Sequence, residues 1–164
     1  MPKNKYVSLL GVLLILASAG SKIAAAAGKS ACEVLTKADV AVLFVGDPKL
    51  NQAKGSTACI WTEGGSDRSL TINPMSMYPA ATLKLIFDGA RTGDEAKKAT
   101  VQDEPTMGVP AYSMTFLHTN PPEVSISALK GGTMLMVRLA GKAFNAGEML
   151  AKLRPLVKKI LTEL

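Results

Sequence analysis

Residues 123–139, EVSISALKGGTMLMVRL, decide the fold of this chain. Lys130-Gly131-Gly132, near the centre, is typical of a β-hairpin turn, because glycine adopts the backbone conformations that such a turn needs. The second half alternates between two sets of side chains that a strand would place on opposite faces: Leu135, Val137 and Leu139, and Met134, Met136 and Arg138. The stretch therefore predicts antiparallel strands over 123–129 and 133–139, with the Leu/Val face packed against helices.

Three more strands are predicted on the N-terminal side of this hairpin. One, over 111–117, directly precedes it. Residues 69–73, SLTIN, alternate with a period of two, the pattern of a half-buried strand. The turn residues 64–67, GGSD, join that strand to another over 58–63, so the two are expected to form a second hairpin.

Helices are predicted from capping residues and apolar spacing. Ser30 with Glu33, and Thr36 with Asp39, have the spacing of capping boxes. Pro79 suits the first turn of a helix, and Asn145 suits the cap of the last one. The predicted helices cover 31–35, 37–45, 79–90 (closed near Gly89) and 145–164.

The order of these elements favours one α+β domain. Residues 49–57 are expected to form a polar loop, and the charged residues 91–108 an exposed connection. Pro155 removes a backbone hydrogen bond from the last helix, so we expect a kink or a restart there. The order α-β-β-α-β-β-β-α predicts a single antiparallel sheet of about five strands, with helices packed on one face.

The N-terminal residues predict export from the cytoplasm. Lys3 and Lys5 precede an apolar run over 7–17, and small residues follow at positions suited to cleavage. This is the pattern of a secretory signal peptide, here 1–27, which leaves a single exported domain over 28–164. A membrane anchor is the alternative, but Gly and Ser residues interrupt the segment, so we expect no stable span after cleavage. The predicted location is periplasmic or secreted.

Charge and cysteine content limit the classes of partner. Removal of Lys3, Lys5 and Lys22 lowers the formal net charge from +6 to +3, and no dense basic stripe with aromatic residues is present. Nucleic acid is therefore not expected as a partner. The two cysteines, Cys32 and Cys59, form an even pair in an exported chain and predict a disulfide.

The sequence does not favour an enzyme. The single histidine, His118, precedes the loop residues Thr119-Asn120-Pro121-Pro122, and the cysteines are expected to be bridged. Neither nucleophilic catalysis nor a zinc site has its usual set of residues. We therefore predict no catalytic residues, no bound cofactor and no conventional metal site.

The methionines leave three interpretations open. Met75 and Met77, like Met134 and Met136, are spaced by two and would share one face of a strand. They are expected to pack in the core, or to line the open side of the sheet with Arg138 as a surface for a partner or ligand. Thioethers also suit Cu(I), so a copper site of Met75, Met77, Met134 and Met136 with His118 is the alternative.

Several short motifs together resemble a family of small exported bacterial proteins of unknown function, many of them lipoproteins. CEVLTKAD at 32–39 is similar to the family's Cys-x-Leu-Leu-Thr-x-x-Asp opening, Cys59-Ile60-Trp61 to its second cysteine before an aromatic residue, and GVPAY at 108–112 to a Gly-x-x-Ala-Tyr stretch. A hairpin followed by a Leu-rich helix closes both patterns. The lipid-attachment cysteine and the usual Gly-Leu-Gly-Asp are missing here.

The resemblance implies a binding or sensor-like fold in the cell envelope and no reaction. We therefore expect a non-enzymatic domain that binds an envelope protein or an apolar ligand. The contact surface would be the methionine-bearing sheet face or the segment 91–110. A periplasmic copper-handling protein is the alternative.

Overall fold

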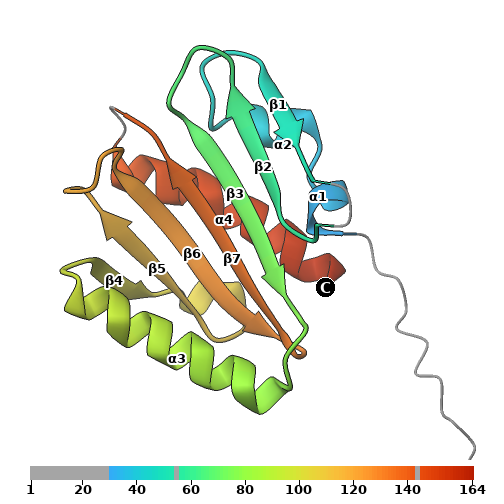
Figure 1. Cartoon of the computed structure of the whole chain (residues 1–164), viewed down its shortest axis with the longest axis vertical. Helices are drawn as coiled ribbons and strands as arrows, with labels where there is room; N and C mark the ends of the chain where they lie inside the picture. Colours follow the sequence, from blue (N-terminus) through green and yellow to red (C-terminus); the bar gives the residue numbers. More distant parts are fainter. Residues whose placement is uncertain (1–29, 54–55, 143–144) are drawn as a thin grey trace, which may run out of the picture.

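The structure is a computed structural model that describes residues 30–53, 56–142 and 145–164, so the predicted signal peptide lies outside it. Figure 1 shows the elements, which in chain order are α1 (Ala31–Val34), α2 (Lys37–Ala41), β1 (Pro48–Asn51), β2 (Cys59–Glu63), β3 (Ser69–Met75), α3 (Ala80–Ala96), β4 (Thr100–Asp103), the 3-10 helix η1 (Pro105–Met107), β5 (Ala111–Phe116), β6 (Glu123–Lys130), β7 (Thr133–Ala140) and α4 (Ala146–Glu163).

The predicted α+β class and single antiparallel sheet are confirmed. The sheet has seven strands in the order β1-β2-β3-β7-β6-β5-β4, and each neighbouring pair is antiparallel. Both predicted hairpins, β2–β3 and β6–β7, are present, and β7 pairs with β3 to join them. The predicted number of about five strands and the predicted order α-β-β-α-β-β-β-α were wrong, because β1 and β4 at the two edges were not expected.

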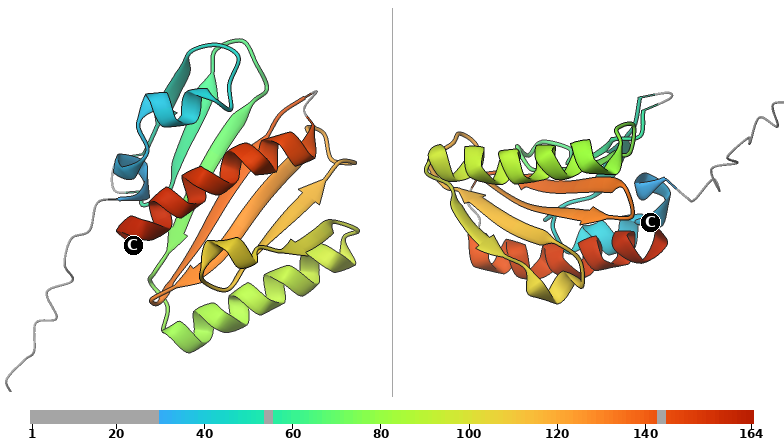
Figure 2. Two further views of the ribbon diagram at one scale, coloured as in Figure 1. Left: turned by 180° about the vertical axis from the view of Figure 1, so that it is seen from behind. Right: turned by 90° about the horizontal axis from the view of Figure 1, so that it is seen from below.

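The helices lie on both faces of the sheet, which corrects the prediction that they pack on one face. Seen along the sheet, α3 covers one side, and α4 with α1 and α2 covers the other (Figure 2). The physical reason is visible in β7, where both sets of alternating residues are used. Leu135 is buried on the α4 side, whereas Met134, its neighbour, is buried with residues of α3.

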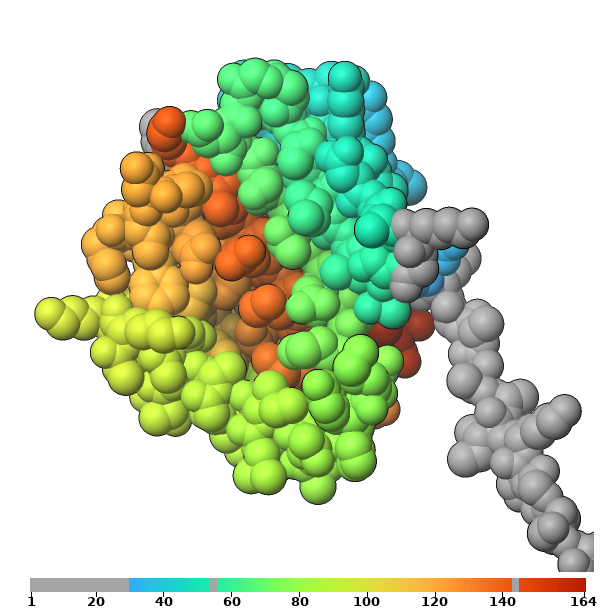
Figure 3. Space-filling model, in the orientation of Figure 1, coloured from blue at the N-terminus to red at the C-terminus, as the bar shows by residue number. Residues whose placement is uncertain are grey.

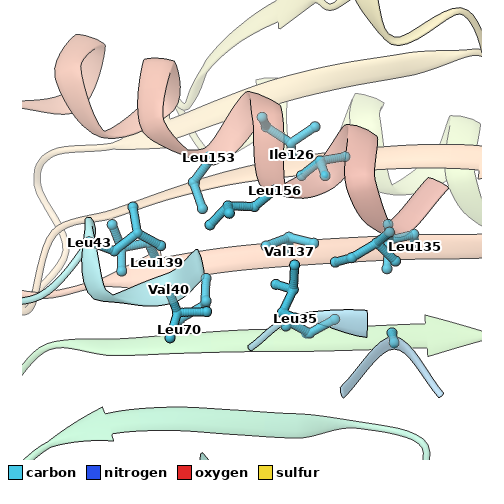
Figure 4. Packing of buried hydrophobic residues seen from close by; sticks show 14 of the residues in the cluster. Leu35, Val40, Leu43, Leu70, Ile126, Leu135, Val137, Leu139, Leu153 and Leu156 are labelled. Atoms are coloured by element: carbon cyan, nitrogen blue, oxygen red, sulfur yellow. The ribbon is translucent and has the colours of Figure 1, made fainter. Parts of the chain in front are cut away.

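The larger core lies between the sheet and α4. Leu135, Val137 and Leu139 of β7 have no exposed surface, and Leu153 and Ile160 of α4 are equally buried. Figure 4 shows these β7 side chains beside Leu153 and Leu156 of α4, and beside residues of α1–α2 and β3. Alternating apolar residues on a strand and an apolar helix face thus produce one continuous core.

A disulfide and an ion pair hold the N-terminal helices to this core. Cys32 of α1 is bonded to Cys59 of β2, as the cysteine pairing predicts. Asp39 of α2 accepts a hydrogen bond of 2.7 Å from Lys159 of α4. This bond, followed by the hydrogen bonds from Thr36, lowers the pKa of Asp39 from 3.8 to about 2. The Thr36–Asp39 capping box is present as predicted.

The edge strands replace two segments that were predicted as loops. β1 overlaps the start of the predicted polar loop, and its exposed residues Lys49, Leu50 and Asn51 explain why no alternation was seen. The segment predicted as an exposed connection contains the end of α3, β4 and η1. The prediction that α3 closes near Gly89 was wrong, because Gly89 lies within the helix at a negative φ and the helix continues to Ala96.

The last helix is continuous through Pro155, so the predicted restart is wrong. Pro155 has no backbone N–H to donate to the carbonyl of Ala151. Both residues lie on the exposed side of α4. Water can therefore bind that carbonyl, and the helix tolerates the proline. None of the helices described here is long and apolar enough to cross a membrane.

A partly buried ion pair fastens the β4–β5 connection to α4. Arg154 of α4 donates two hydrogen bonds to the Glu104 carboxylate, from Nε to Oε2 at 2.8 Å and from Nη2 to Oε1 at 2.7 Å. Glu104 is 3% exposed. The bonds from Arg154 lower the pKa of Glu104 below its ordinary value of 4.5, although burial acts in the opposite direction.

Arg154→Met should therefore destabilise the protein in a pH-dependent way. It leaves the Glu104 carboxylate buried without its partner, and we expect a loss of about 2 kcal/mol at pH 7, less than for a fully buried pair because the Arg154 side chain is 36% exposed. A carboxylate with a lowered pKa stabilises the fold above its ordinary pKa. The difference between variant and parent, measured by urea unfolding, should shrink as the pH falls below 4.5. A constant difference from pH 7 to pH 3 would contradict this assignment.

Candidate ligand-binding cleft

The side of α3 that faces the sheet carries large apolar residues in the first half of the helix and small or charged residues after it. Leu83 and Phe87 are its two buried residues, and both lie in its first half. The next positions on the same side, at helical spacing, are Ala90, Asp94 and Lys97. Ala90 and Asp94 are half-buried and Lys97 is exposed. The second half of α3 therefore lies over the sheet without filling the space below it.

The first half of α3 packs on a small second core. Leu83 and Phe87 are buried with Tyr112, Met114 and Met134. The rings of Phe87 and Tyr112 meet edge to face, with centroids 5.1 Å apart. This contact fixes the height of α3 above the sheet at the point where its apolar side ends.

An ion pair holds the second half of α3 in place. The Arg91 guanidinium lies 2.7 Å from the Asp103 carboxylate of β4 and 3.5 Å from Glu95. It also lies 6.0 Å from the centre of the Tyr112 ring, within the range of a cation–π contact. These contacts at the outer edge position the helix although its underside is not packed.

The sheet face below this part of α3 becomes polar. Tyr112 of β5 pairs with Ser127 of β6, which pairs with Met136 of β7. In the next row, Met114 pairs with Ser125, which pairs with Arg138. Small serine side chains therefore lie opposite Ala90 and Asp94, and both surfaces leave room between them.

The result is a hollow of about 240 Å³ between α3 and the sheet. In the space-filling view, atoms of β6 and β7 remain visible beside α3, on the face that carries the hollow (Figure 3). Its walls combine apolar side chains with hydroxyls and both signs of charge: Ala90, Met114, Phe116, Met134 and Met136; Tyr112, Ser125 and Ser127; Asp94 and Glu123; Lys97 and Arg138. A concave site with a few convergent polar groups is the usual form of a small-molecule site.

Two ionisable groups at the inner end of the hollow are perturbed by burial. Burial raises the pKa of the Asp94 carboxyl, and the charge of Lys97 and a hydrogen bond with Tyr112 only partly offset this. Burial also raises the pKa of the Tyr112 hydroxyl, and the negative charge of Asp94 adds to the shift. A carboxylate desolvated in a cleft is a common feature of ligand-binding and catalytic sites.

The outer end carries a loose ion pair. Arg138 Nη1 lies 3.6 Å from Glu123 Oε2, longer than a charge-assisted hydrogen bond. The side chain of Arg138 is 44% exposed, whereas that of Glu123 is 20% exposed. The guanidinium thus keeps donors that are available to another group in the hollow.

Three of the predicted surface residues come together here, and two do not. Met134, Met136 and Arg138 line the hollow. Met134 is 3% exposed below α3, so it does not lie on an open face. Met75 pairs with Met134 across β3 and β7 and packs against the second core, whereas Met77 is 80% exposed beyond the end of β3.

The residues of the alternative copper site are brought together only in part: Met75, Met134 and Met136 lie on neighbouring strands β3 and β7, whereas His118 lies elsewhere. His118 is exposed after the end of β5, where its ring meets Phe116 edge to face at 5.6 Å. That end of β5 pairs with Glu123, at the opposite end of the sheet from Met75 and Met134. Within the described parts of the chain, no group of three or more His, Cys, Asp or Glu residues could hold a metal ion.

The sequence-based site prediction missed the α3 side of the hollow and the polar groups on its floor. Asp94 and Lys97 were included in the charged connection, and Tyr112, Ser125 and Ser127 were assigned only to strands. One signal was available. The spacing of Leu83, Phe87, Ala90, Asp94 and Lys97 continues one helix side past Gly89 and changes from large apolar to small and charged.

The comparisons with known proteins leave the function open. No protein-family model matches this chain, and no curated protein matches it. Among solved structures, it is similar to the solution structure of cyanobacterial PsbP (CyanoP) from Synechocystis, with a TM-score of 0.36 and 11% sequence identity. The match covers 71% of this chain and 79% of that chain. At this level of similarity nothing about function follows.

Proposed function

We propose that this chain is an exported binding protein that takes a small polar ligand into the hollow between α3 and the sheet. The observation that carries the proposal is that α3 and the sheet lose their apolar packing over the same area. If α3 served only to cover the sheet, large apolar residues would be expected at positions 90 and 94. Instead, Ala90 and Asp94 lie opposite Ser125 and Ser127.

Binding fits this site better than catalysis. The hydroxyls in the hollow have no histidine beside them, because His118 belongs to the loop after β5 and does not line the hollow. Histidine is the general base that most often activates a serine. The carboxylates Asp94 and Glu123 each have a basic residue in the same hollow, an arrangement that suits recognition of charged groups.

Export is part of the proposal and has separate support. The sequence pattern over 1–27 is typical of a signal peptide. The Cys32–Cys59 disulfide is the kind of bond that persists in the periplasm or outside the cell. We therefore propose that the ligand is a small molecule met in the cell envelope.

Filling the hollow should abolish binding and leave the fold intact. In Ala90→Leu, the longer side chain would occupy the space above Ser125 and Ser127, so the melting temperature should stay equal or rise. Binding is measured by NMR of ¹³C-labelled methionine methyl groups, with a small-molecule extract of the producing cells added. The signals of Met114, Met134 and Met136 should shift in the parent, and that of the exposed Met77 should not.

A matched control is available on the same helix. Ala81→Leu makes the same change at an exposed position outside the hollow, so it should keep the ligand-induced shifts. The proposal fails if the extract leaves the three cleft signals unchanged in the parent, or if Ala90→Leu folds and still shows the shifts.

A further inference from the structure

We infer that the ligand is zwitterionic: one small molecule that carries an ammonium group, bound at Asp94, and an anionic group, bound at Arg138. This inference rests on the proposed function and specifies the class of its ligand. It follows from two charged groups that line one hollow: Asp94, which forms none of the ion pairs found among the described residues, and Arg138, whose only ion pair there is the 3.6 Å contact with Glu123.

Asp94 is the group that would receive the ammonium. It lies on the sheet-facing side of α3, is half-buried, and lines the hollow beside Tyr112. None of the ion pairs formed among the described residues includes Asp94. Burial of the Asp94 carboxylate is unfavourable, and the charge of Lys97 and the hydrogen bond with Tyr112 only partly offset it, as the raised pKa of Asp94 indicates. A ligand ammonium would place a positive charge in direct contact with the carboxylate.

Arg138 is the group that would receive the anion. It lies between Ser125 of β6 and Thr71 of β3 in the register of the sheet, so hydroxyl groups flank it on both sides. Its contact with Glu123 is long and involves one nitrogen. A guanidinium has five N–H donors in a planar fork that suits a carboxylate or phosphate. Ligand binding in this position would use donors that the protein leaves free.

The remainder of the hollow fits an uncharged body between the two ends. Asp94 and Glu123 balance Lys97 and Arg138, so the formal charge of the hollow is close to zero. A ligand with one charge of each sign keeps this balance, whereas a ligand with a single charge leaves one end uncompensated. Between the ends, Met136 contributes a flexible apolar surface that adapts to a short carbon chain.

Linear ω-amino acids of increasing length test this inference and also measure the distance between the two ends. Glycine, β-alanine, 4-aminobutyrate and 6-aminohexanoate are titrated into the purified full domain, with the methyl signals of Met134 and Met136 as the readout. One chain length should bind at least tenfold more tightly than the alkylamine and the alkylcarboxylate of the same length. Equal binding of the singly charged compounds, or no binding of any member, would overturn the inference.

Variants assign each charge to its residue. Asp94→Asn and Arg138→Gln should each weaken binding of the preferred zwitterion at least tenfold, and Arg138→Lys should retain part of it. The control Asp88→Asn changes an exposed acid on the outer side of α3 and should have no effect. Unchanged binding in folded Asp94→Asn would refute the assignment. If the cell extract shifts the cleft signals but no zwitterion does, this inference fails and the proposed function stands.

Discussion

Replacing both cysteines by alanine, in Cys32→Ala/Cys59→Ala, should lower the free energy of unfolding by about 3.5 kcal/mol. The bond closes a loop with a sequence separation of 27 residues, and its removal restores the conformational freedom of that loop in the unfolded chain. Both positions are buried, at 4% and 1% exposure, so alanine introduces no unpaired polar group. Urea unfolding of the variant and the parent measures the difference.

The effect should be concentrated at the N-terminal end of the domain. The disulfide joins α1 to β2, and α2 is held separately by the ion pair between Asp39 and Lys159. Hydrogen exchange should therefore increase most in α1, whereas the β6–β7 hairpin keeps its protection. Reducing the parent protein should reproduce the loss. A parent protein that already has two free thiols, or a loss below about 1 kcal/mol, would contradict the disulfide's role.

Met134→Lys should destabilise the domain by more than about 3 kcal/mol, whereas Met136→Lys should fold. Met134 is 3% exposed and belongs to the core between α3 and β5. Lysine there loses the packing of the methionine and places a charge in apolar surroundings. Met136 is half-buried at the hollow, where a lysine can reach water. Thermal and urea unfolding of the two variants provide the comparison.

Both methionines line the hollow, but Met134 is also buried in the second core, whereas Met136 is half-buried. Met136→Lys should retain the parent's melting temperature within a few degrees and change the binding of small molecules. If Met134→Lys were as stable as the parent, α3 would not be packed on this face as described. If Met136→Lys unfolded, the hollow would be part of the core and not a site.

The strands with strong alternation could be predicted from the sequence, and the edges of the sheet could not. β7 and β3 alternate because one face of each strand packs on the larger core. β1 has three exposed residues among its four, and β4 is exposed in all but one. β1 and β4 pair with β2 and β5 through backbone hydrogen bonds. Such pairing does not require alternating apolar side chains, so the sequence shows no strand pattern there.

The arrangement of α3 could be predicted only in part. Leu83 and Phe87 predict that one side of this helix is buried. They do not show which face of the sheet the helix covers. Gly89 suggested an end, because glycine is unfavourable inside helices by about 1 kcal/mol. A tertiary contact, the ion pair between Arg91 and Asp103 of β4, and a local one, between Arg91 and Glu95 of the same helix, override this preference. The hollow arises from this continuation, so the site was missed together with it.

The methionine-bearing face could be recognised from the sequence as a candidate surface, although the sequence did not show that α3 lies over it. Met134, Met136 and Arg138 were placed on one face by alternation alone, and the structure places all three at one hollow. What sequence could not show was that α3 crosses this face and divides it into a packed part and an unfilled part. That division turns part of a predicted open surface into a small cleft.

The central claim, that a small molecule occupies the hollow, is tested most directly by native mass spectrometry of the domain purified from the cells that make it. The parent protein and Ala90→Leu are compared side by side. Added mass is expected on the folded parent, lost on unfolding and absent from Ala90→Leu. A parent protein without added mass, or the same added mass on both proteins, would contradict the claim.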